Sequence, residues 1–355
     1  MPAGVGPVPI TSAAKLRQTL IEKTVMLQWA AVSPVFQKLK VRGIGTRQYI
    51  WGRVHRDVAQ PDYSPIGGSV PTVHTDIQQM SAIMSYFGFR VDVDFREIED
   101  SANFEDPRAF NVRVATEAQA FFAMQELFEG NPGVQRTVTN AAGKKLTVNP
   151  LPGLRYALDN QAISGLNNLK VDCGGTDLSA AGNSPTNSRV FARKMDQMVR
   201  QVSNGMGENI TIVGPIEVTS ALGDVMRQGN MFKTTDDSFG RAVPTWGDYG
   251  CQILDSGLKT PNSLIWDTTT SANRVIGWEA ATGVRDDSSN FTSIYLIDFS
   301  TNGVQGVEQF GMDVKDLGLQ QSDGVTYSTR AMWSLGLCYL NPNAVLRLFD
   351  IKVRP

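Results

Sequence analysis

A single long helix over residues 107–129 is the feature that most constrains what this chain can fold into. Asp106 can accept a hydrogen bond from the free amides of the first turn, and Pro107 occupies a position whose missing N–H costs nothing. Residues 130–133 (Gly-Asn-Pro-Gly) supply a residue that tolerates a left-handed conformation and then a proline that cannot continue a helix. The predicted helix is about 35 Å long.

Apolar residues recur along this helix at spacings of three and four, which predicts one buried face. Glu117 falls inside that stripe, which indicates either a partner-facing edge at this point or a rotation of the helix slightly different from the predicted one. A strand over residues 83–95 and an acidic connection over 96–106 precede the helix, so the whole unit indicates a scaffold rather than a site for chemistry. The predicted buried stripe consists of Phe110, Val114, Ala118, Phe121, Met124 and Phe128.

The composition is that of an ordinary soluble chain, with 41% hydrophobic and 19% charged residues among 355. No apolar run approaches the ~18 residues that a membrane span requires. The first residues lack the basic start and apolar centre of a signal peptide, which favours a cytoplasmic protein. Three cysteines, odd in number and widely spaced, argue against disulfides and zinc.

Charge is distributed unevenly along the chain. Residues 1–60 hold nine basic and two acidic side chains, a net +7, so the remainder must carry −9 to give the total of −2. Opposite charges on different parts of one chain favour self-association between copies. A solvated basic segment and a nucleic-acid contact are the alternatives. The candidate contact residues in this arm are Lys15, Arg17 and Lys23.

Residues 46–58 and 69–75 read as two arms of a β-hairpin with a turn-rich tip at 59–68. Both faces of the hairpin mix polar and apolar side chains, so we expect it to lie on another subunit rather than on its own core. The aromatic and basic residues could instead stack on nucleic acid; we favour a protein interface, which such residues also anchor. The candidate contacts are Tyr49, Trp51, Arg53, His55, Arg56 and Tyr63.

The rest of the chain alternates strands and helices. A second hairpin is predicted at 134–148, and 172–188 and 232–245 are predicted to be a loop and an irregular stretch. Helices are predicted from 152 to 160, 191 to 202 and 214 to 226. The remaining predicted strands are 209–213, 250–254, 263–266, 293–299, 306–310, 330–340 and 345–353.

Catalytic chemistry has little to build on. His55 and His74 are the two histidines of the chain, so a histidine-rich metal centre cannot form, and a hydrolase using either one is a distant alternative. The chain has no Gly-x-x-x-x-Gly-Lys phosphate loop. The acidic pairs at 236–237 and 286–287 lie in polar stretches, which favours solvated turn residues.

Three stretches in this order resemble the Hong Kong 97-type major capsid protein of tailed bacteriophages. Residues 89–101 resemble its strand and acidic turn before the spine helix, residues 210–226 with 246–254 and 264–267 its axial domain, and residues 329–345 its closing strands. The resemblance implies an α+β chain of four parts. These are an N-terminal arm (1–45), an extended β-hairpin loop (46–80), a peripheral domain (81–165 and 300–338) with a spine helix (107–129), and an α/β axial domain (166–299 and 339–355).

The resemblance further implies a structural subunit, not an enzyme, with no cofactor and no membrane contact. Hexamers and pentamers would form the icosahedral head of a virion, assembled in the host cytoplasm around double-stranded DNA. A separate scaffolding protein, a portal and a cement or decoration protein are the implied partners. Residues 46–75 contain no lysine, so covalent cross-linking through the loop is not expected. An encapsulin-like compartment shell with the same fold is the alternative.

Overall fold

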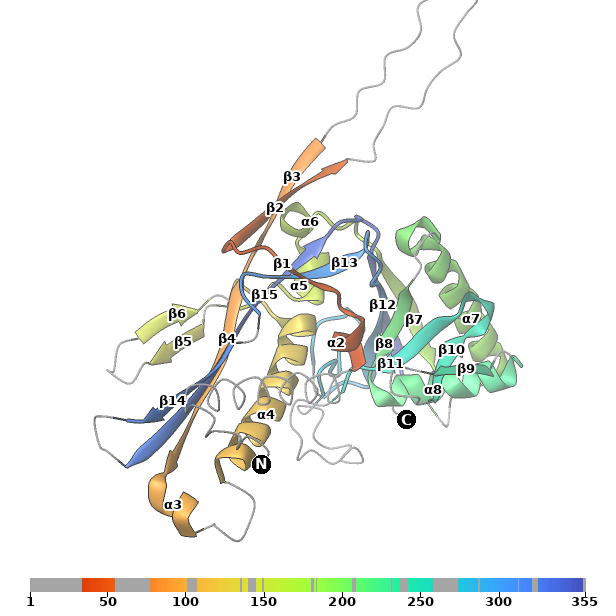
Figure 1. Ribbon diagram of the computed structural model, residues 1–355. Coiled ribbons are helices and arrows are strands. Elements are labelled where there is room, and N and C mark those ends of the chain that lie inside the picture. Colours follow the sequence, from red (N-terminus) through yellow and green to blue (C-terminus); the bar gives the residue numbers. More distant parts are fainter. Residues whose placement is uncertain are drawn as a thin grey trace, which may run out of the picture.

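The computed structural model combines a long twisted sheet, a second sheet flanked by helices, and a hairpin that projects from the body (Figure 1). The described residues are 34–54, 77–100, 107–134, 136–139, 145–148, 150–179, 182, 184–205, 209–230, 232–236, 242–257, 274–286, 288–311, 313–320 and 325–353. A five-residue helix, α2 (Pro34–Lys38), leads into the body and buries Val35.

The first sheet is organised around the 14-residue strand β15 (Thr326–Tyr339). Over its first ten residues β15 pairs antiparallel with β4 (Ser85–Asp94), and β14 (Asp313–Leu319) lies along its other edge. Its last four residues pair with β13 (Val304–Glu308), and β1 (Val41–Gly43) adds a parallel strand there. One strand therefore connects the far end of the sheet to the region below the hairpin.

The predicted long helix is confirmed with its predicted bounds, as α4 (Pro107–Glu129). It lies against β4, where the rings of Phe87 and Phe122 meet edge to face with centroids 6.0 Å apart. A short helix, α3 (Phe95–Asp100), occupies the start of the predicted acidic connection.

The buried face of α4 differs from the predicted stripe. Phe110 and Val114 are 45% and 46% exposed, whereas Val112 and Thr116 are buried. The stripe prediction is correct for Met124 and Phe128 and wrong for the first half of the helix. With about 100° of rotation per residue, the predicted and the observed stripe both have helical spacing, and the observed one includes the small buried residues Ala120 and Ala123. Glu117 lies half-buried beside this face.

Gly130 ends the helix for a reason other than the predicted left-handed conformation. Its φ is not positive, but a Cβ at this position would lie 2.1 Å from the carbonyl oxygen of Leu151. The returning chain crosses here, and the Gly153 amide donates to the Gly130 carbonyl at 2.8 Å. The chain returns through the predicted second hairpin, β5 (Arg136–Thr139) with β6 (Lys145–Val148), and then forms α5 (Leu154–Asp159) and α6 (Gln161–Ser164).

The second sheet has seven strands in the order β7-β16-β12-β8-β11-β10-β9. Two helices, α7 (Pro185–Gln201) and α8 (Ile216–Gln228), flank it at one side of the molecule (Figure 1). Two 3₁₀ turns, η1 (Val202–Gly205) and η2 (Gly247–Tyr249), lie between these elements. The strands are β7 (Lys170–Asp177), β8 (Ile210–Gly214), β9 (Phe232–Asp236), β10 (Ala242–Trp246), β11 (Cys251–Asp255), β12 (Phe291–Asp298) and β16 (Val345–Lys352).

Two predictions for this region are wrong. Strand β7 overlaps the start of the predicted loop 172–188, and it contains Gly174 and Gly175, both at positive φ, which break the alternation expected of a strand. Strand β9 and nearly all of β10 occupy the predicted irregular stretch 232–245, and β9 is an exposed edge strand without apolar alternation. In the first sheet, strand β14 (Asp313–Leu319) was not predicted from the sequence. The predicted strand 263–266 lies outside the described residues.

One apolar core joins the two sheets. It contains Leu127 and Phe128 from α4 together with Tyr295 from β12 and Val345 from β16. A second core lies between α7, α8 and the seven-stranded sheet, where Trp246 is fully buried and its indole N–H donates to Asp196 at 2.9 Å. Of the helices within the described ranges, none combines the length and apolar character needed to cross a membrane.

Candidate assembly surface

The base of the projecting hairpin is a two-stranded ribbon, β2 (Gln48–Val54) and β3 (Ile77–Ile83). Its register places Trp51 opposite Met80 and Ile50 opposite Ser81. Because side chains alternate between the faces of a strand, Trp51 and Met80 share one face, and Ile50 lies on the other.

The inner face packs on its own chain. Trp51 and Met80 are 8% and 4% exposed and join Val307 and Cys338 in a small core at the end of the first sheet. Tyr49 stacks on Trp51 with ring centroids 5.6 Å apart. The expectation of a hairpin without a core of its own is therefore wrong at its base. The strand that pairs with residues 48–54 is β3, and Met80 and Ala82 of β3 supply the apolar partners. The predicted return strand 69–75 lies outside the described residues.

The outer face of the same ribbon exposes three isoleucines. Ile50, Ile77 and Ile83 are 52%, 67% and 53% exposed, and all three lie on the face opposite Trp51. Single exposed apolar side chains are common, but several on one face of a projecting ribbon indicate a contact surface. The sequence analysis missed Ile77 and Ile83 because it assigned residues 77–82 to no strand, and the apolar residues there do not alternate strictly with polar ones.

The spine helix α4 carries a second exposed apolar surface. Phe110 and Val114, one turn apart, are each about half exposed, and the guanidinium of Arg113 lies over the Phe110 ring at 5.3 Å. The predicted contact residue Glu117 lies on the same helix, half-buried. Its role at a subunit contact stays a prediction.

Most of the other predicted contact residues lie outside the described ranges. Arg53 belongs to β2, but its side chain is not described. Residues Lys15, Arg17, Lys23, His55, Arg56, Tyr63 and His74 lie outside the described residues.

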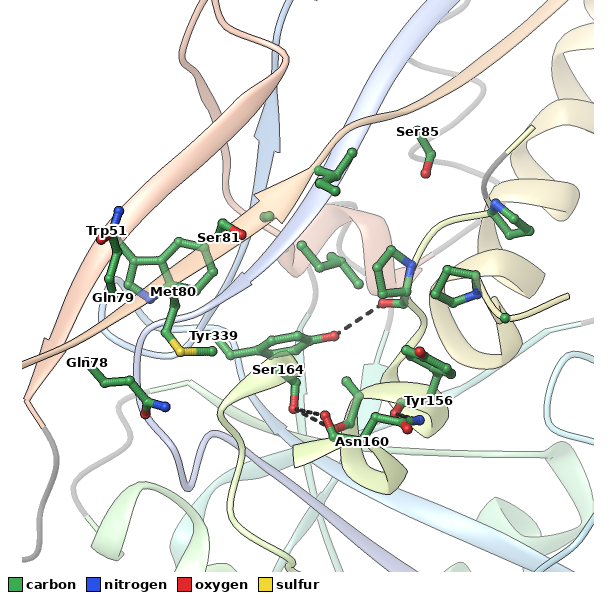
Figure 2. A pocket seen from close by; sticks show the side chains of 18 residues that line it. Trp51, Gln78, Gln79, Met80, Ser81, Ser85, Tyr156, Asn160, Ser164 and Tyr339 are labelled. Carbon is green, nitrogen blue, oxygen red and sulfur yellow. Dashed lines mark hydrogen bonds between the residues drawn. The ribbon is translucent and has the colours of Figure 1, made fainter. Parts of the chain in front are cut away.

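A cavity of about 520 Å³ lies between the hairpin base and α5 and α6 (Figure 2). Trp51 and Met80 border it on the hairpin side, and Tyr156 and Ser164 border it on the side of the two short helices. Tyr339, the last residue of β15, extends into the space between them, and its hydroxyl donates to the Pro152 carbonyl at 3.5 Å.

A buried ion-pair cluster ties the short helix α5 to the seven-stranded sheet. The Glu279 carboxylate, 2% exposed, pairs with Arg347 of β16 at 2.7 Å and with Arg155 of α5 at 3.5 Å. Ser293 also donates to Glu279, and both arginines donate to the Gly283 carbonyl. All of these charges are used in structural pairing, so the cluster offers no free acid or base.

Groups suited to catalysis are equally few in the described part of the chain. No cluster of three or more metal-ligating side chains occurs there. The three cysteines are free and buried, and burial raises the pKa of Cys173 to about 12 and of Cys251 and Cys338 to about 11. Asp286 accepts from the hydroxyl and amide of Ser288, the geometry of a solvated turn, and these bonds lower its pKa.

Comparison with solved structures identifies the architecture. The chain superposes on the holo-SrpI encapsulin complex of Synechococcus elongatus PCC 7942 with a TM-score of 0.55 and 15% identity, covering 94% of this chain and 90% of that one. A virus-like particle from Pyrococcus furiosus gives a TM-score of 0.50 and 9% identity, with 94% and 99% coverage. The capsid of an empty GTA particle gives 0.51 and 13%, with 90% and 89% coverage.

The chain has the Hong Kong 97-type capsid fold. No protein-family profile and no curated protein matches the sequence, so it is the order and pairing of elements that carry the likeness. Within the Hong Kong 97-type fold, α4 corresponds to the spine helix, and β2 with β3 forms the base of the extended loop. The division into arm, loop, peripheral and axial domains at the predicted boundaries stays a prediction.

Proposed function

We propose that this chain is a structural subunit that self-assembles into a closed icosahedral shell. The observation that carries the proposal is the projecting β2–β3 ribbon, whose inner face packs on its own chain while its outer face presents Ile50, Ile77 and Ile83 to solvent. A fold shared with an encapsulin and a virus-like particle supports the same role.

The size of the exposed surface suits a repeated contact. Burying a whole isoleucine side chain contributes about 1.5–3 kcal/mol, and each of these three is roughly half exposed, so covering them contributes about 2–5 kcal/mol per hairpin. Such a contribution is modest for one pair of subunits. In a closed ring every copy presents this surface to one neighbour and covers the same surface of another, so the small free-energy contribution recurs at each contact around the shell.

Charge supplies a second attraction between copies. The first 60 residues carry a net +7 against −9 in the remainder, so arm and body of different copies attract each other. This attraction is screened by salt. We therefore expect assembly to slow as ionic strength rises.

The finer proposal is the major capsid protein of a tailed-phage head, built of hexamers and pentamers around double-stranded DNA. A scaffolding protein, a portal and a cement or decoration protein would be its partners, with assembly in the host cytoplasm and the virion as its final location. The second candidate is an encapsulin-like compartment shell. The chain has a TM-score of 0.55 to the SrpI encapsulin and of 0.51 to the empty GTA capsid, so the likeness of fold supports both candidates alike. The two differ in cargo, not in fold.

Electron microscopy of the purified chain tests the shell role. The unchanged chain should form closed particles, whereas Ile50→Glu combined with Ile83→Glu should leave a soluble subunit of 38.8 kDa with an unchanged circular dichroism spectrum. Val190→Glu combined with Val284→Glu places the same two charges at positions that are 45% and 63% exposed, and this matched control should assemble normally. Normal particles from the double variant would exclude the ribbon's outer face as a contact.

Light scattering and cargo analysis complete the test. A monomer at every concentration and salt, with or without a scaffolding partner, would refute the shell role. Particles that protect double-stranded DNA from nuclease would support the capsid, and particles that contain a co-purified enzyme and no DNA would support the compartment.

A further inference from the structure

Strand β16 changes its register against β7 at one point, and a buried aspartate lies there. Asp172 of β7 is opposite Phe349, and the next pair is Thr176 with Ile351. Asp350 alone therefore lies opposite three residues of β7. Such a bulge interrupts the ladder of backbone hydrogen bonds. Side-chain contacts consequently have a larger part in holding the two strands together at this point.

The backbone on both sides of the bulge brings two carboxyl groups over one turn. Asp350 has a φ of 61°, a left-handed conformation that aspartate tolerates better than most residues. Gly174 and Gly175, at φ values of 63° and 64°, form the turn opposite it. The Gly174 amide donates to Asp172 Oδ1 at 2.6 Å, and the Gly175 amide lies within hydrogen-bonding reach of the Asp350 carboxyl.

The carboxyl groups of Asp172 and Asp350 also lie within hydrogen-bonding reach of each other. Two ionised carboxylates only accept hydrogen bonds, so this contact forms when one of the two carries a proton. Asp350 is 6% exposed and its Oδ1 has no partner among the described residues, whereas Asp172 is exposed. Burial, and next the charge of Asp172, raise the pKa of Asp350 above its usual value, so the proton belongs on Asp350.

Other titratable groups around the bulge do not remove this preference. Lys194 of α7 lowers the pKa of Asp350 but only partly offsets burial, and its Nζ donates to the backbone carbonyls of Asp172 and Cys173 at 3.3 and 2.9 Å. The Cys173 thiol, with a pKa raised to about 12, is neutral at physiological pH. On the other side of β16, strand β12 places the neutral Thr292 opposite the next residue.

We propose that the Asp172–Asp350 pair is a pH-sensitive switch that controls how firmly β7 is held to β16. In mild acid, protonated Asp350 donates to the Asp172 carboxylate and closes the bulge. At higher pH the proton is lost, two negative charges remain in contact, and residues 173–177 separate more readily from β16. Strand β7 ends the seven-stranded sheet, and its hydrogen-bonded neighbour there is β16.

The sign follows from linkage. A carboxyl group whose pKa is raised by folding contributes stability at low pH, and that contribution is lost as the pH rises through the raised pKa. The pairing of β7 with β16 should therefore be firmer in mild acid than at neutral pH. This proposal is independent of the shell role, since the switch lies within one subunit and is testable before assembly.

Hydrogen exchange of the unassembled full-length subunit tests the switch. Rates are corrected for the intrinsic effect of pH, and the fully buried strand β8 serves as the internal reference for global changes. Relative to β8, the protection of residues 173–177 should fall by about tenfold between about pH 4 and pH 7.5, which is the effect of one pKa unit of coupling. Equal protection at the two pH values would overturn the proposal.

Two variants separate the switch from a general effect of pH. Asparagine tolerates the left-handed conformation, and its amide can donate to Asp172 at every pH, so Asp350→Asn should keep residues 173–177 protected at both pH values. Asp286→Asn, in an exposed turn, is the matched control and should retain the pH dependence of the unchanged chain. A pH dependence that persists in Asp350→Asn would overturn the assignment to this pair.

A double-mutant cycle tests whether the two carboxyl groups act together. At pH 7.5, Asp172→Asn at its exposed position and Asp350→Asn should each raise the urea midpoint, because each removes one of the two charges in contact. The double variant should gain no more than the better single variant, since the repulsion can be removed only once. Additive gains, or a lower midpoint for Asp172→Asn, would show that the two groups do not form a coupled pair.

Discussion

Two phenylalanines on the spine helix offer a direct test of how α4 is oriented. Phe128 is fully buried and its ring meets that of Tyr295 edge to face, with centroids 5.4 Å apart. Phe110 is 45% exposed and contacts Arg113. The same substitution, Phe→Ala, at these two positions of one helix should therefore have very different effects on stability.

The magnitudes follow from burial. Truncating a buried phenylalanine costs about 3–5 kcal/mol, and the lost aromatic pair places Phe128→Ala toward the upper end. For 355 residues the unfolding entropy is roughly 0.75 kcal/mol per degree, so the melting temperature should fall by about 4–7 °C. Phe110→Ala removes a half-exposed ring and should cost less than about 1 kcal/mol, or roughly 1 °C.

The assay is calorimetry or circular dichroism melting of the unassembled subunit, because assembly raises apparent stability by mass action. Guanidinium titration of the same two variants gives an independent measure of the free energy of unfolding. Equal losses for the two variants, or a larger loss for Phe110→Ala, would refute the orientation of α4 described above and restore the stripe expected from the sequence.

Three further outcomes are expected. Burial raises the pKa of Asp255 above its usual value of 3.8, so the stability that this group contributes is present at low pH and is lost as the pH rises through the raised pKa. The variant Asp255→Asn can still accept a hydrogen bond from the Gly257 amide. It should therefore raise the urea midpoint at pH 7.5 but not below about pH 4. A lower midpoint for that variant at pH 7.5 would contradict the burial argument. The thiols of Cys173, Cys251 and Cys338, with pKa values raised to about 11 or 12, should resist a thiol-exchange reagent at pH 8 in the folded chain. All three should react once guanidinium has unfolded the chain, and rapid labelling of the folded chain would show that they are accessible. Glu279→Gln should lower the free energy of unfolding by about 3–5 kcal/mol, because it leaves buried arginines without a counter-charge. Asp224→Asn, in an exposed ion pair on α8, should change it by less than about 1 kcal/mol. Equal losses of unfolding free energy in denaturant titrations would mean that the Glu279 cluster is hydrated.

The bounds of the spine helix were predictable because its ends depend on local chemistry. Pro107 and Gly130 act within one turn of the chain, and both mark the observed ends. The rotation of the helix was not predictable in the same way, since apolar residues occur on two sides of it. Which side is buried depends on the fit to β4 and β12, and that information lies far away in the sequence.

Strand prediction failed where a strand lacks apolar alternation. The predominantly apolar segment 345–353 was predicted as a strand and forms β16, whereas β7 contains two adjacent glycines and β9 is exposed along its whole length. In the hairpin, the first arm was predicted, but residues 77–82 were assigned to no strand. That omission concealed both the small core around Trp51 and the exposed face that carries Ile77 and Ile83.

The long strand β15 has a mechanical consequence for a subunit held on all sides by neighbours. Fourteen extended residues span roughly 45 Å, and for most of that length hydrogen bonds to β4 and β14 resist bending. A load applied near Thr326 at the far end of the sheet is therefore carried along the strand to Tyr339, which borders the cavity beneath the hairpin. Pressure from a neighbour at one end of the subunit would be felt as a displacement at the root of the projecting ribbon at the other.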